Sequence, residues 1–283
     1  MAGALVAFSV IAVSIRALAG TLNVFEILAI RSGSGLTILL IILLVQPRLR
    51  SEIVPRRMAL HLVRNSFHFC GQYAWTLGLT LLPFATVFAL EFTAPAWVTL
   101  LAVFLLHERL TTSRIGAVIL GFLGILLILR PGLESFRPEA LIVLLAALLF
   151  ANAIIATKKL TADVSTFAIL FWMNVLHLPM ALAGSDWLFL QKIEIWQLPW
   201  VAGVAVAGLC ANFFTSNAFR VGDATVIVPI DFLRVPLIAV VGWLFYGEAL
   251  DVFVFAGAGL IFLGLLWNLH AETRPTIPMV GQG

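Results

Sequence analysis

Long apolar stretches, separated by short polar or basic segments, dominate the chain. A helix needs about 20 mostly apolar residues to cross the hydrocarbon core of a bilayer. Ten stretches meet this requirement, near 2–19, 26–46, 59–80, 84–106, 113–130, 139–157, 165–184, 198–219, 224–246 and 252–269. Many connections are shorter than ten residues, which makes the helices on either side antiparallel. The pattern predicts an all-α polytopic membrane protein with ten transmembrane helices.

The composition excludes a soluble fold. Hydrophobic residues make up 62% of the 283 residues and charged residues only 11%, against roughly 45–50% and about 25% in soluble domains. We interpret 1–19 as a first span and not a removable signal peptide, because it has no basic leading segment and no small-residue cleavage site. Cys70 and Cys210 lie within apolar runs without metal or redox spacing, so we expect both to be buried packing residues.

Basic residues in the short loops predict the orientation. With a cytoplasmic N-terminus, ten basic residues face the cytoplasm and three face the outside. Cytoplasmic loops of membrane proteins carry the excess of Lys and Arg. We therefore expect an integral protein of the bacterial inner (plasma) membrane with both termini cytoplasmic, including a disordered cytoplasmic tail at 271–283. The outer residues are Arg130, Arg137 and Lys192; the cytoplasmic ones are Arg48, Arg50, Arg56, Arg57, Arg109, Arg114, Lys158, Lys159, Arg220 and Arg274.

The chain matches itself at an offset of 140 residues. The predicted helix caps Thr111 and Asp251 also correspond. Each half holds five spans, and an odd number makes the second copy enter the membrane from the opposite side. We expect two inverted five-helix repeats, 1–132 and 133–270, an architecture typical of secondary transporters with a midplane site. The matched segments are Cys70-Gly-Gln72 with Cys210-Ala-Asn212, Glu91-Phe92 with Asp231-Phe232, Glu108 with Glu248, and Phe122-Leu123-Gly124 with Phe262-Leu263-Gly264.

Several of these segments resemble a known family. Glu108-Arg-Leu-Thr-Thr-Ser-Arg-Ile-Gly116, continuing to Gly124 and Arg130-Pro-Gly132, resembles the end of a first EamA domain. Asp231-Phe-Leu-Arg-Val-Pro236 with Gly247-Glu248 resembles the same region of a second one. The chain is thus similar, over almost its whole length, to the ten-helix EamA-like branch of the drug/metabolite transporter (DMT) superfamily. The resemblance implies transport of amino acids, vitamins, cofactors or drug-like solutes, and the stretch from Gln72 through Pro95 is similar to riboflavin and S-adenosylmethionine uptake members.

Charged residues within the spans are the first candidates for a site. A charge at a helix centre costs roughly 2.5–3.5 kcal/mol on insertion scales, so it is kept where it faces a cavity or a partner. Glu91 and Asp231 occupy equivalent positions in the fourth and ninth spans. They could bind a cationic substrate group, or one could carry a coupling proton. Alternatively, Asp231 simply pairs with Arg234, three residues later on the same helix face.

Polar residues of the second, third and eighth spans are further candidates. A guanidinium such as that of Arg31 can anchor a substrate carboxylate or phosphate; alternatively it is a partner for Glu91 or for a carbonyl of a broken helix. Gln72 and Asn212 form a second matched pair, with Tyr73 and Ser216 within about a turn. These side chains either line a polar cavity or hydrogen-bond between helices.

Two prolines suggest kinks beside the acidic residues. Pro95 and Pro236 are matched to within one residue, and each follows its carboxylate by four or five positions. A proline frees a carbonyl one turn earlier and bends the helix, so we predict a gating role for both. Trp97, at the same depth, either walls the cavity or faces lipid.

Other conspicuous residues have structural interpretations. We expect Arg16, Glu108 and Glu248 to be structural, and Arg64 and Glu26 to snorkel from span ends. Six glycines of the fifth and tenth spans allow close helix packing, within the chain or in a dimer. They are Gly116, Gly121, Gly124, Gly257, Gly259 and Gly264.

These observations favour a secondary transporter over two alternatives, a membrane scaffold or regulator and a membrane enzyme. No H-E-x-x-H, G-x-S-x-G or phosphate-binding loop is present, and His68 and His177 are isolated in the sequence. We expect no catalytic residue, metal, cofactor or nucleic acid. The expected partners are a small-molecule substrate and the lipid bilayer, with coupling to a proton or counter-solute, and a homodimer, left open.

Overall fold

The computed structural model describes residues 2–106, 111–130, 137–221 and 230–273, except for the side chains of 102–106, 212, 215–221 and 272–273. Across the described residues the chain is helical and contains no strand. The helices are α1 (Ala2–Leu18), α2 (Val24–Val45), η1 (Pro47–Ser51), α3 (Met58–Leu81), α4 (Phe84–Glu91), α5 (Ala94–Leu106), α6 (Thr112–Leu129), α7 (Ala140–Leu160), α8 (Thr166–Leu182), η2 (Phe189–Lys192), η3 (Ile195–Gln197), α9 (Leu198–Val221), α11 (Arg234–Tyr246) and α12 (Val252–Thr273).

Within the described part, five helical segments are long and apolar enough to cross a membrane: Val24–Val45, Phe84–Leu101, Thr112–Leu129, Ala140–Leu160 and Val252–Ala271. Three shorter apolar helices are Ala2–Leu18, Thr166–Leu182 and Ile195–Ala211. Because the predicted runs reappear as helices, the all-α prediction is confirmed, while the number of ten spans stays a prediction.

Two predicted spans are broken next to an acidic residue. The predicted run 84–106 forms α4 and α5, which are separated by turn residues Phe92 and Thr93. Similarly, a helical turn at 230–232 is separated from α11 by Leu233. The proline of each segment lies in the first turn after the break, as Pro95 in α5 and Pro236 in α11. A proline there loses no helical hydrogen bond, because the first amides of a helix have no intrahelical acceptor.

Polar side chains begin several helices at the predicted positions. The hydroxyl of Thr111 accepts a hydrogen bond from the Arg114 amide at the start of α6. The Asp251 carboxylate accepts one from the Phe253 amide, 2.9 Å away, at the start of α12. Both side chains satisfy amides that would otherwise lack an acceptor, so the two predicted caps are confirmed.

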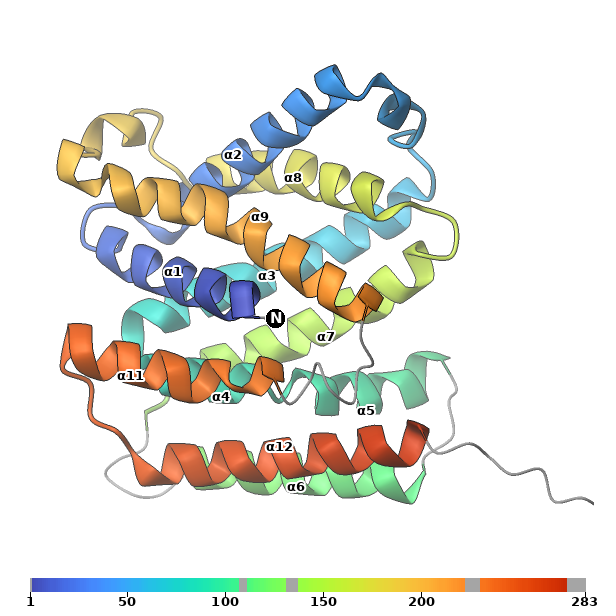
Figure 1. Cartoon of the computed structure of the whole chain (residues 1–283), viewed down its shortest axis with the longest axis vertical. Helices are drawn as coiled ribbons and strands as arrows, with labels where there is room; N and C mark the ends of the chain where they lie inside the picture. The colour runs from blue at the N-terminus through green and yellow to red at the C-terminus, as the bar shows by residue number, and fades with distance from the viewer. Residues whose placement is uncertain (1, 107–110, 131–136, 222–229, 274–283) are drawn as a thin grey trace, which may run out of the picture.

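Helices far apart in the sequence lie side by side (Figure 1). α6 and α12 run together along one edge of the molecule, and α2 packs with α8 along the opposite edge. Between these edges α3 packs against α7 and α1 against α9, while α4 lies against both α7 and α11. The arrangement surrounds a middle region with helices from both halves of the chain.

Glycines allow α6 and α12 to approach closely. A methyl group at Gly124 would lie 2.6 Å from the backbone oxygen of Gly257. One at Gly264 would lie 3.0 Å from the backbone oxygen of Ala117. A side chain at Gly124 would force the backbone to shift, and one at Gly264 would press on its neighbour, so both glycines serve close helix packing within the chain. Gly259, by contrast, has open space around it.

The expectations for Glu26 and for the cysteines need correction. Glu26 does not snorkel: it is fully buried, accepts a hydrogen bond from the Asn23 amide and pairs with Lys192 at 2.7 Å. Cys70 is exposed on α3 and Cys210 is half-buried, so Cys70 is not the buried packing residue expected. Cys70 lies on the outward face of α3, while its neighbours Phe69 and Gly71 are buried. In a bilayer, lipid provides an apolar environment for such a face.

Candidate functional site

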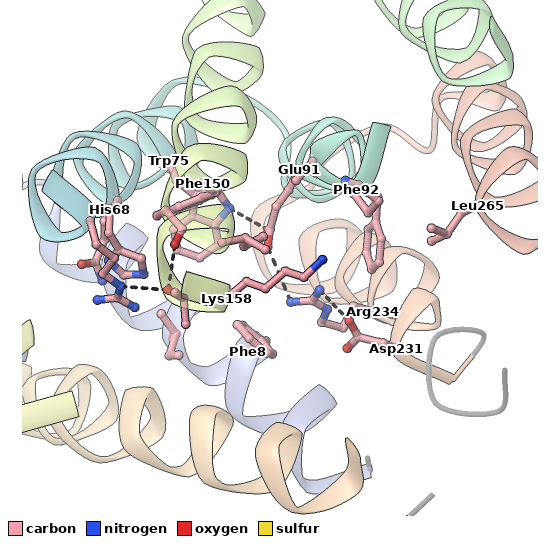
Figure 2. A pocket seen from close by; sticks show the side chains of 18 of the residues that line it. Phe8, His68, Trp75, Glu91, Phe92, Phe150, Lys158, Asp231, Arg234 and Leu265 are labelled. Carbon is pink, nitrogen blue, oxygen red and sulfur yellow. Dashed lines mark hydrogen bonds and ion pairs between the residues drawn. The ribbon is translucent and has the colours of Figure 1, made fainter. Parts of the chain in front are cut away.

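A cavity of about 740 Å³ lies in the middle of the helices. It receives residues from α1, α2, α3, α4, α5, α7, α11 and α12, and Figure 2 shows most of their side chains. Ligand pockets of proteins typically measure about 300–1,000 Å³, so the cavity has room for a small metabolite. The lining residues are Phe8, Ile11, Arg31, Arg64, His68, Gln72, Trp75, Glu91, Phe92, Ala94, Pro95, Phe150, Ala153, Ile154, Thr157, Lys158, Thr161, Asp231, Arg234 and Leu265.

Both acidic candidates face this cavity, and Arg234 lies between them (Figure 2). One nitrogen of its guanidinium is 2.9 Å from an Asp231 oxygen, and another is 3.7 Å from a Glu91 oxygen. The Trp75 indole N–H donates a 2.8 Å hydrogen bond to the second oxygen of Glu91. The predicted Asp231–Arg234 pair is therefore present, and Glu91 belongs to the same network.

Aromatic rings enclose the guanidinium of Arg234. Its central carbon lies 4.1 Å from the centre of the Phe8 ring and 4.9 Å from that of Phe92. The side chain is only 8% exposed. Aromatic faces attract a cation while excluding water, so the rings hold the charge in a position that both carboxylates can reach.

One face of α3 supplies a column of polar side chains. Arg64, His68, Gln72 and Trp75 follow one another at intervals of four, four and three residues, which places them on the same side of a helix. The Gln72 amide oxygen, turned toward α2, accepts hydrogen bonds from the Arg31 guanidinium at 2.5–3.2 Å. Arg31 thus contacts Gln72, and not Glu91 as one alternative held.

Arg64 also faces the cavity and does not snorkel from the span end. Its side chain is buried, with the residue 7% exposed. It donates to Thr157 on α7 at 3.2 Å and to its neighbour Asn65 at 2.7 Å. The expectation from span position was wrong, because packing of α3 against α7 turns this end of the helix inward.

The two histidines that look isolated in the sequence meet in the structure. The rings of His68 on α3 and His177 on α8 stack with their centres 5.2 Å apart and an angle of 26° between planes. Phe150 on α7 lies 5.6 Å from His68 on another side. His68 lines the cavity. The helices α3 and α8 are remote in sequence, so no spacing rule could reveal this pair.

Other predicted site residues lie elsewhere. Tyr73 packs against Phe25 at 4.7 Å, on a different side of α3 from Gln72. Trp97 packs edge-to-face on a phenylalanine of α6, 5.4 Å away. Neither of these residues, nor Pro236, is among the described residues that line the cavity, whereas Pro95 is. Asn212 and Ser216 belong to α9, and their side chains lie outside the described residues.

Sequence reasoning missed several lining residues. Phe8 and Phe150 are apolar positions within apolar spans, and nothing in the sequence separates them from lipid-facing positions. Lys158 served only to predict orientation, yet its side chain extends into the cavity (Figure 2). Its place at the end of an apolar run, beside Thr157, was the available signal.

The cavity has one exposed end and one closed end. Lys158 and Thr161, at the C-terminal end of α7, are exposed lining residues. At the other end the lining on α3 stops at Trp75, and one turn further the Leu79 carbonyl accepts 2.6–2.8 Å hydrogen bonds from Arg16 of α1. Arg16 thereby joins α1 to α3 just beyond the cavity.

A carboxylate from beyond α11 completes this closed end. Glu248 forms an ion pair with Arg16, and its other oxygen accepts a 2.9 Å hydrogen bond from the Phe84 amide at the start of α4. The Arg16 guanidinium lies 3.6 Å from the centre of the Phe84 ring. The expected structural role of Arg16 and Glu248 is therefore to connect α1, α3, α4 and the end of α11.

Comparison with known proteins adds a family and several relatives. The EamA-like transporter family model matches twice, at residues 1–130 and 137–269. An S-adenosylmethionine uptake transporter of Rickettsia felis is 30% identical over 227 residues, covering 80% of this chain and 76% of the relative. A riboflavin transporter of Brucella anthropi is 30% identical over 221 residues, covering 76% and 77%.

Two further similarities extend over more of the chain. A pseudopaline exporter of Pseudomonas aeruginosa is 27% identical over 264 residues, covering 92% of this chain and 90% of the relative. A solved crystal structure, 17% identical, superimposes with a TM-score of 0.55 over 97% of this chain and 99% of the other. That likeness concerns the fold alone.

Proposed function

Because the chain belongs to the EamA-like transporter family, and is thus an integral membrane transporter of small metabolites, we propose that it works by alternating access. Two inverted five-helix repeats, 1–132 and 133–270, form the ten spans, and the substrate site is the cavity between them. The single observation that carries the proposal is this cavity, in which Glu91 of the first repeat and Asp231 of the second share one arginine.

The helix contacts support the inverted repeat. Exchange of the halves pairs α1 with α7, α2 with α8, α3 with α9, α4 and α5 with α11, and α6 with α12. Under this exchange the contact of α3 with α7 becomes that of α9 with α1, and the contact of α2 with α9 becomes that of α8 with α3. All four contacts are present, as a two-fold axis between the halves requires.

The close approach of α6 and α12 follows the same rule. At the offset of 140, Gly124 corresponds to Gly264 and Ala117 to Gly257. The contact of Gly124 with Gly257 therefore maps onto the contact of Gly264 with Ala117, and both occur. Two halves of similar structure and opposite direction can exchange conformations at similar energy, which alternating access requires.

We assign the described conformation to the inward-facing state. The excess of basic residues in the short loops supports a cytoplasmic position, at a bacterial inner membrane, for both termini and for the exposed end of the cavity near Lys158. The Arg16–Glu248 pair then closes the outer side. Opening that side requires its separation, and Pro95 and Pro236, beside the helix breaks, are the proposed hinges.

The relatives bear on function class and substrate. Their names are those of transporters, which argues against an enzyme, and a scaffold or regulator would not need a cavity shared by both repeats. The relatives handle S-adenosylmethionine, riboflavin and pseudopaline, so we propose an amino acid, vitamin, cofactor or drug-like solute as the substrate here. A proton on Glu91 or Asp231, or a counter-solute, is the proposed coupling partner, and a homodimer is compatible with this scheme.

Counterflow into proteoliposomes tests the proposal. A panel of amino acids, vitamins, cofactors and drug-like solutes, with riboflavin and S-adenosylmethionine among them, is tested one solute at a time. For at least one member, vesicles loaded with the unlabelled solute should accumulate the same labelled solute through the purified chain. Glu91→Gln and Asp231→Asn should lower this accumulation at least tenfold. Asp163→Asn provides the matched control, because Asp163 is an exposed carboxylate that pairs with Arg57 outside the cavity. Flux of normal size in both site variants would contradict the assignment of the carboxylates.

The panel also separates the alternatives. Absence of counterflow for every solute of the proposed classes, with folded protein in the vesicles, would favour a scaffold or regulator. Flux that an imposed pH gradient does not change would exclude the proton as the coupling partner, leaving a counter-solute or movement driven by the solute gradient alone.

A further inference from the structure

Basic side chains outnumber acidic ones around the cavity, and the acidic ones are confined to one part of it. Among the described lining residues four side chains are basic and two are acidic. Both carboxylates, Glu91 and Asp231, lie within 4 Å of Arg234. Lys158 reaches the same part of the cavity from α7 (Figure 2). The remaining basic pair, Arg31 and Arg64, faces the part of the cavity formed by α2 and α3.

This second part of the cavity contains cations without a neighbouring anion. Among the described residues no carboxylate oxygen lies within 4 Å of the guanidinium of Arg31 or Arg64. Their neighbours are neutral: Gln72 for the first, Asn65 and Thr157 for the second. A buried cation at membrane depth is costly unless an anion or a set of acceptors faces it. A bound anionic ligand would supply that partner.

The side chain between the two arginines has a free hydrogen-bonding atom. His68 lies one turn of α3 from Arg64 and one turn from Gln72. Its Nδ1 is buried and has no hydrogen-bond partner in the described part of the chain. The His68 side chain lines the cavity, and an imidazole N–H can donate to a carboxylate or phosphate oxygen.

Flat apolar surfaces adjoin this group. Phe150 lies 5.6 Å from His68, and Trp75 stands one turn beyond Gln72 on the same face of α3. Aromatic faces at this position suit a planar, conjugated ring system. The cavity therefore combines a group of donors for an anion with a surface for a ring.

We infer that the substrate is a planar ring compound with a carboxylate or phosphate, and that this anionic group binds between Arg31 and Arg64 beside His68. The inference rests on the proposed function, since it specifies what the cavity transports. Arginine suits both anions because its planar fork donates two parallel hydrogen bonds.

Matched acid and neutral probes test this inference by thermal shift of the purified full-length chain. The carboxylate arm compares nicotinate with nicotinamide and benzoate with benzamide. The phosphate arm compares flavin mononucleotide with riboflavin. We expect the acid of at least one pair to raise the melting temperature and its neutral partner to do so far less, because a ligand that binds only the folded state stabilises it. The arm that responds identifies the anion.

Variants connect the effect to the arginines. Arg31→Gln and Arg64→Gln should each weaken binding of the acid about tenfold or more, which is about 1.4 kcal/mol. Arg31→Lys should weaken it less, since the charge remains and only the fork is lost. Arg56→Gln is the control, a basic residue that is exposed and outside the cavity. It should bind the acid as the unchanged chain does.

Each outcome decides for or against the inference. The inference is overturned if neutral probes stabilise the chain as much as the acids do. It is also overturned if no acid stabilises the chain. Acid binding that survives Arg31→Gln and Arg64→Gln together overturns it as well. Counterflow distinguishes this failure from that of the proposed function. Acids that bind through the arginines without being transported would contradict transport alone, and transport of neutral solutes by the doubly substituted chain would contradict the anion site alone.

Discussion

Removal of Arg234 should destabilise the protein through the carboxylates that remain. Arg234→Met keeps an unbranched side chain over the Phe8 ring but leaves Glu91 and Asp231 facing the cavity without their cation. Two unit charges about 4 Å apart attract by about 4 kcal/mol at an effective dielectric constant of about 20. Breaking a buried pair by removing one partner costs about 3–5 kcal/mol, because a charge is left without compensation.

The exposed fractions of the side chains refine this magnitude. Arg234 is 8% exposed, while the side chains of Glu91 and Asp231 are 20% and 18% exposed toward the cavity. Water in the cavity screens part of the remaining repulsion, so we expect the lower half of that range, roughly 3–4 kcal/mol. At about 2–4 °C per kcal/mol for a chain of this size, the apparent Tm should fall by roughly 6–16 °C.

A triple substitution separates charge from packing. In Arg234→Met combined with Glu91→Gln and Asp231→Asn, no unpaired charge remains, and Gln still offers an oxygen to the Trp75 indole. At least half of the Tm loss should therefore be recovered. The assay is thermal unfolding in detergent, followed by size-exclusion chromatography, with Arg56→Gln as an exposed control. A triple variant as unstable as the single one would refute the electrostatic reasoning and assign the loss to packing.

Three further predictions concern the closed end, the helix crossing and the outer loop. Arg16→Met and Glu248→Gln should each cost roughly 3 kcal/mol in unfolding free energy, but the double variant little more, because both remove one ion pair; additive losses in a denaturation series would contradict this. Gly124→Leu should cost roughly 1–3 kcal/mol or prevent folding, since its Cβ would meet the backbone of α12, whereas Gly259→Leu, with open space around it, should be nearly neutral in the same series. The pKa of Lys192 is raised by its hydrogen bonds to carboxylates, first of all that of Glu26, so its contribution to stability is present at neutral pH and is lost as the pH rises through that pKa. Lys192→Met should therefore lower Tm at pH 7 and reduce the loss of Tm above about pH 10. An unchanged loss of Tm at alkaline pH would show that another group titrates there.

The internal repeat made the main features of the site predictable. Glu91 and Asp231 stood out because a charge deep in an apolar run is costly and because the two positions match at one offset. The structure places both at one cavity. Of the two contacts that connect them through Arg234, the spacing of Asp231 and Arg234 predicted one. The other, between Arg234 and Glu91, depends on the packing of α4 against α11.

Other residues could be assigned only from the packing. Arg64 looked like a snorkelling residue, because distance from a span end does not reveal which way the helix turns it. Tyr73 was grouped with Gln72 as its neighbour in sequence, although consecutive residues of a helix point about 100° apart. Trp97 follows Pro95 by two residues and faces α6 for the same reason.

The sequence by itself determined that this chain is a helical membrane protein. So apolar a chain cannot bury its apolar surface in a soluble fold, and lipid requires every backbone group to be paired within helices. It also determined the repeat, because matched positions are a property of order along the chain. Only the tertiary structure decided which helix faces meet. The stacked pair of His68 and His177, the closure by Arg16 and Glu248, and the unequal charges around the cavity all join helices far apart in the chain. Their side chains lie close only because particular helix faces pack, and in lipid an apolar face has no solvent preference that would mark it for the interior.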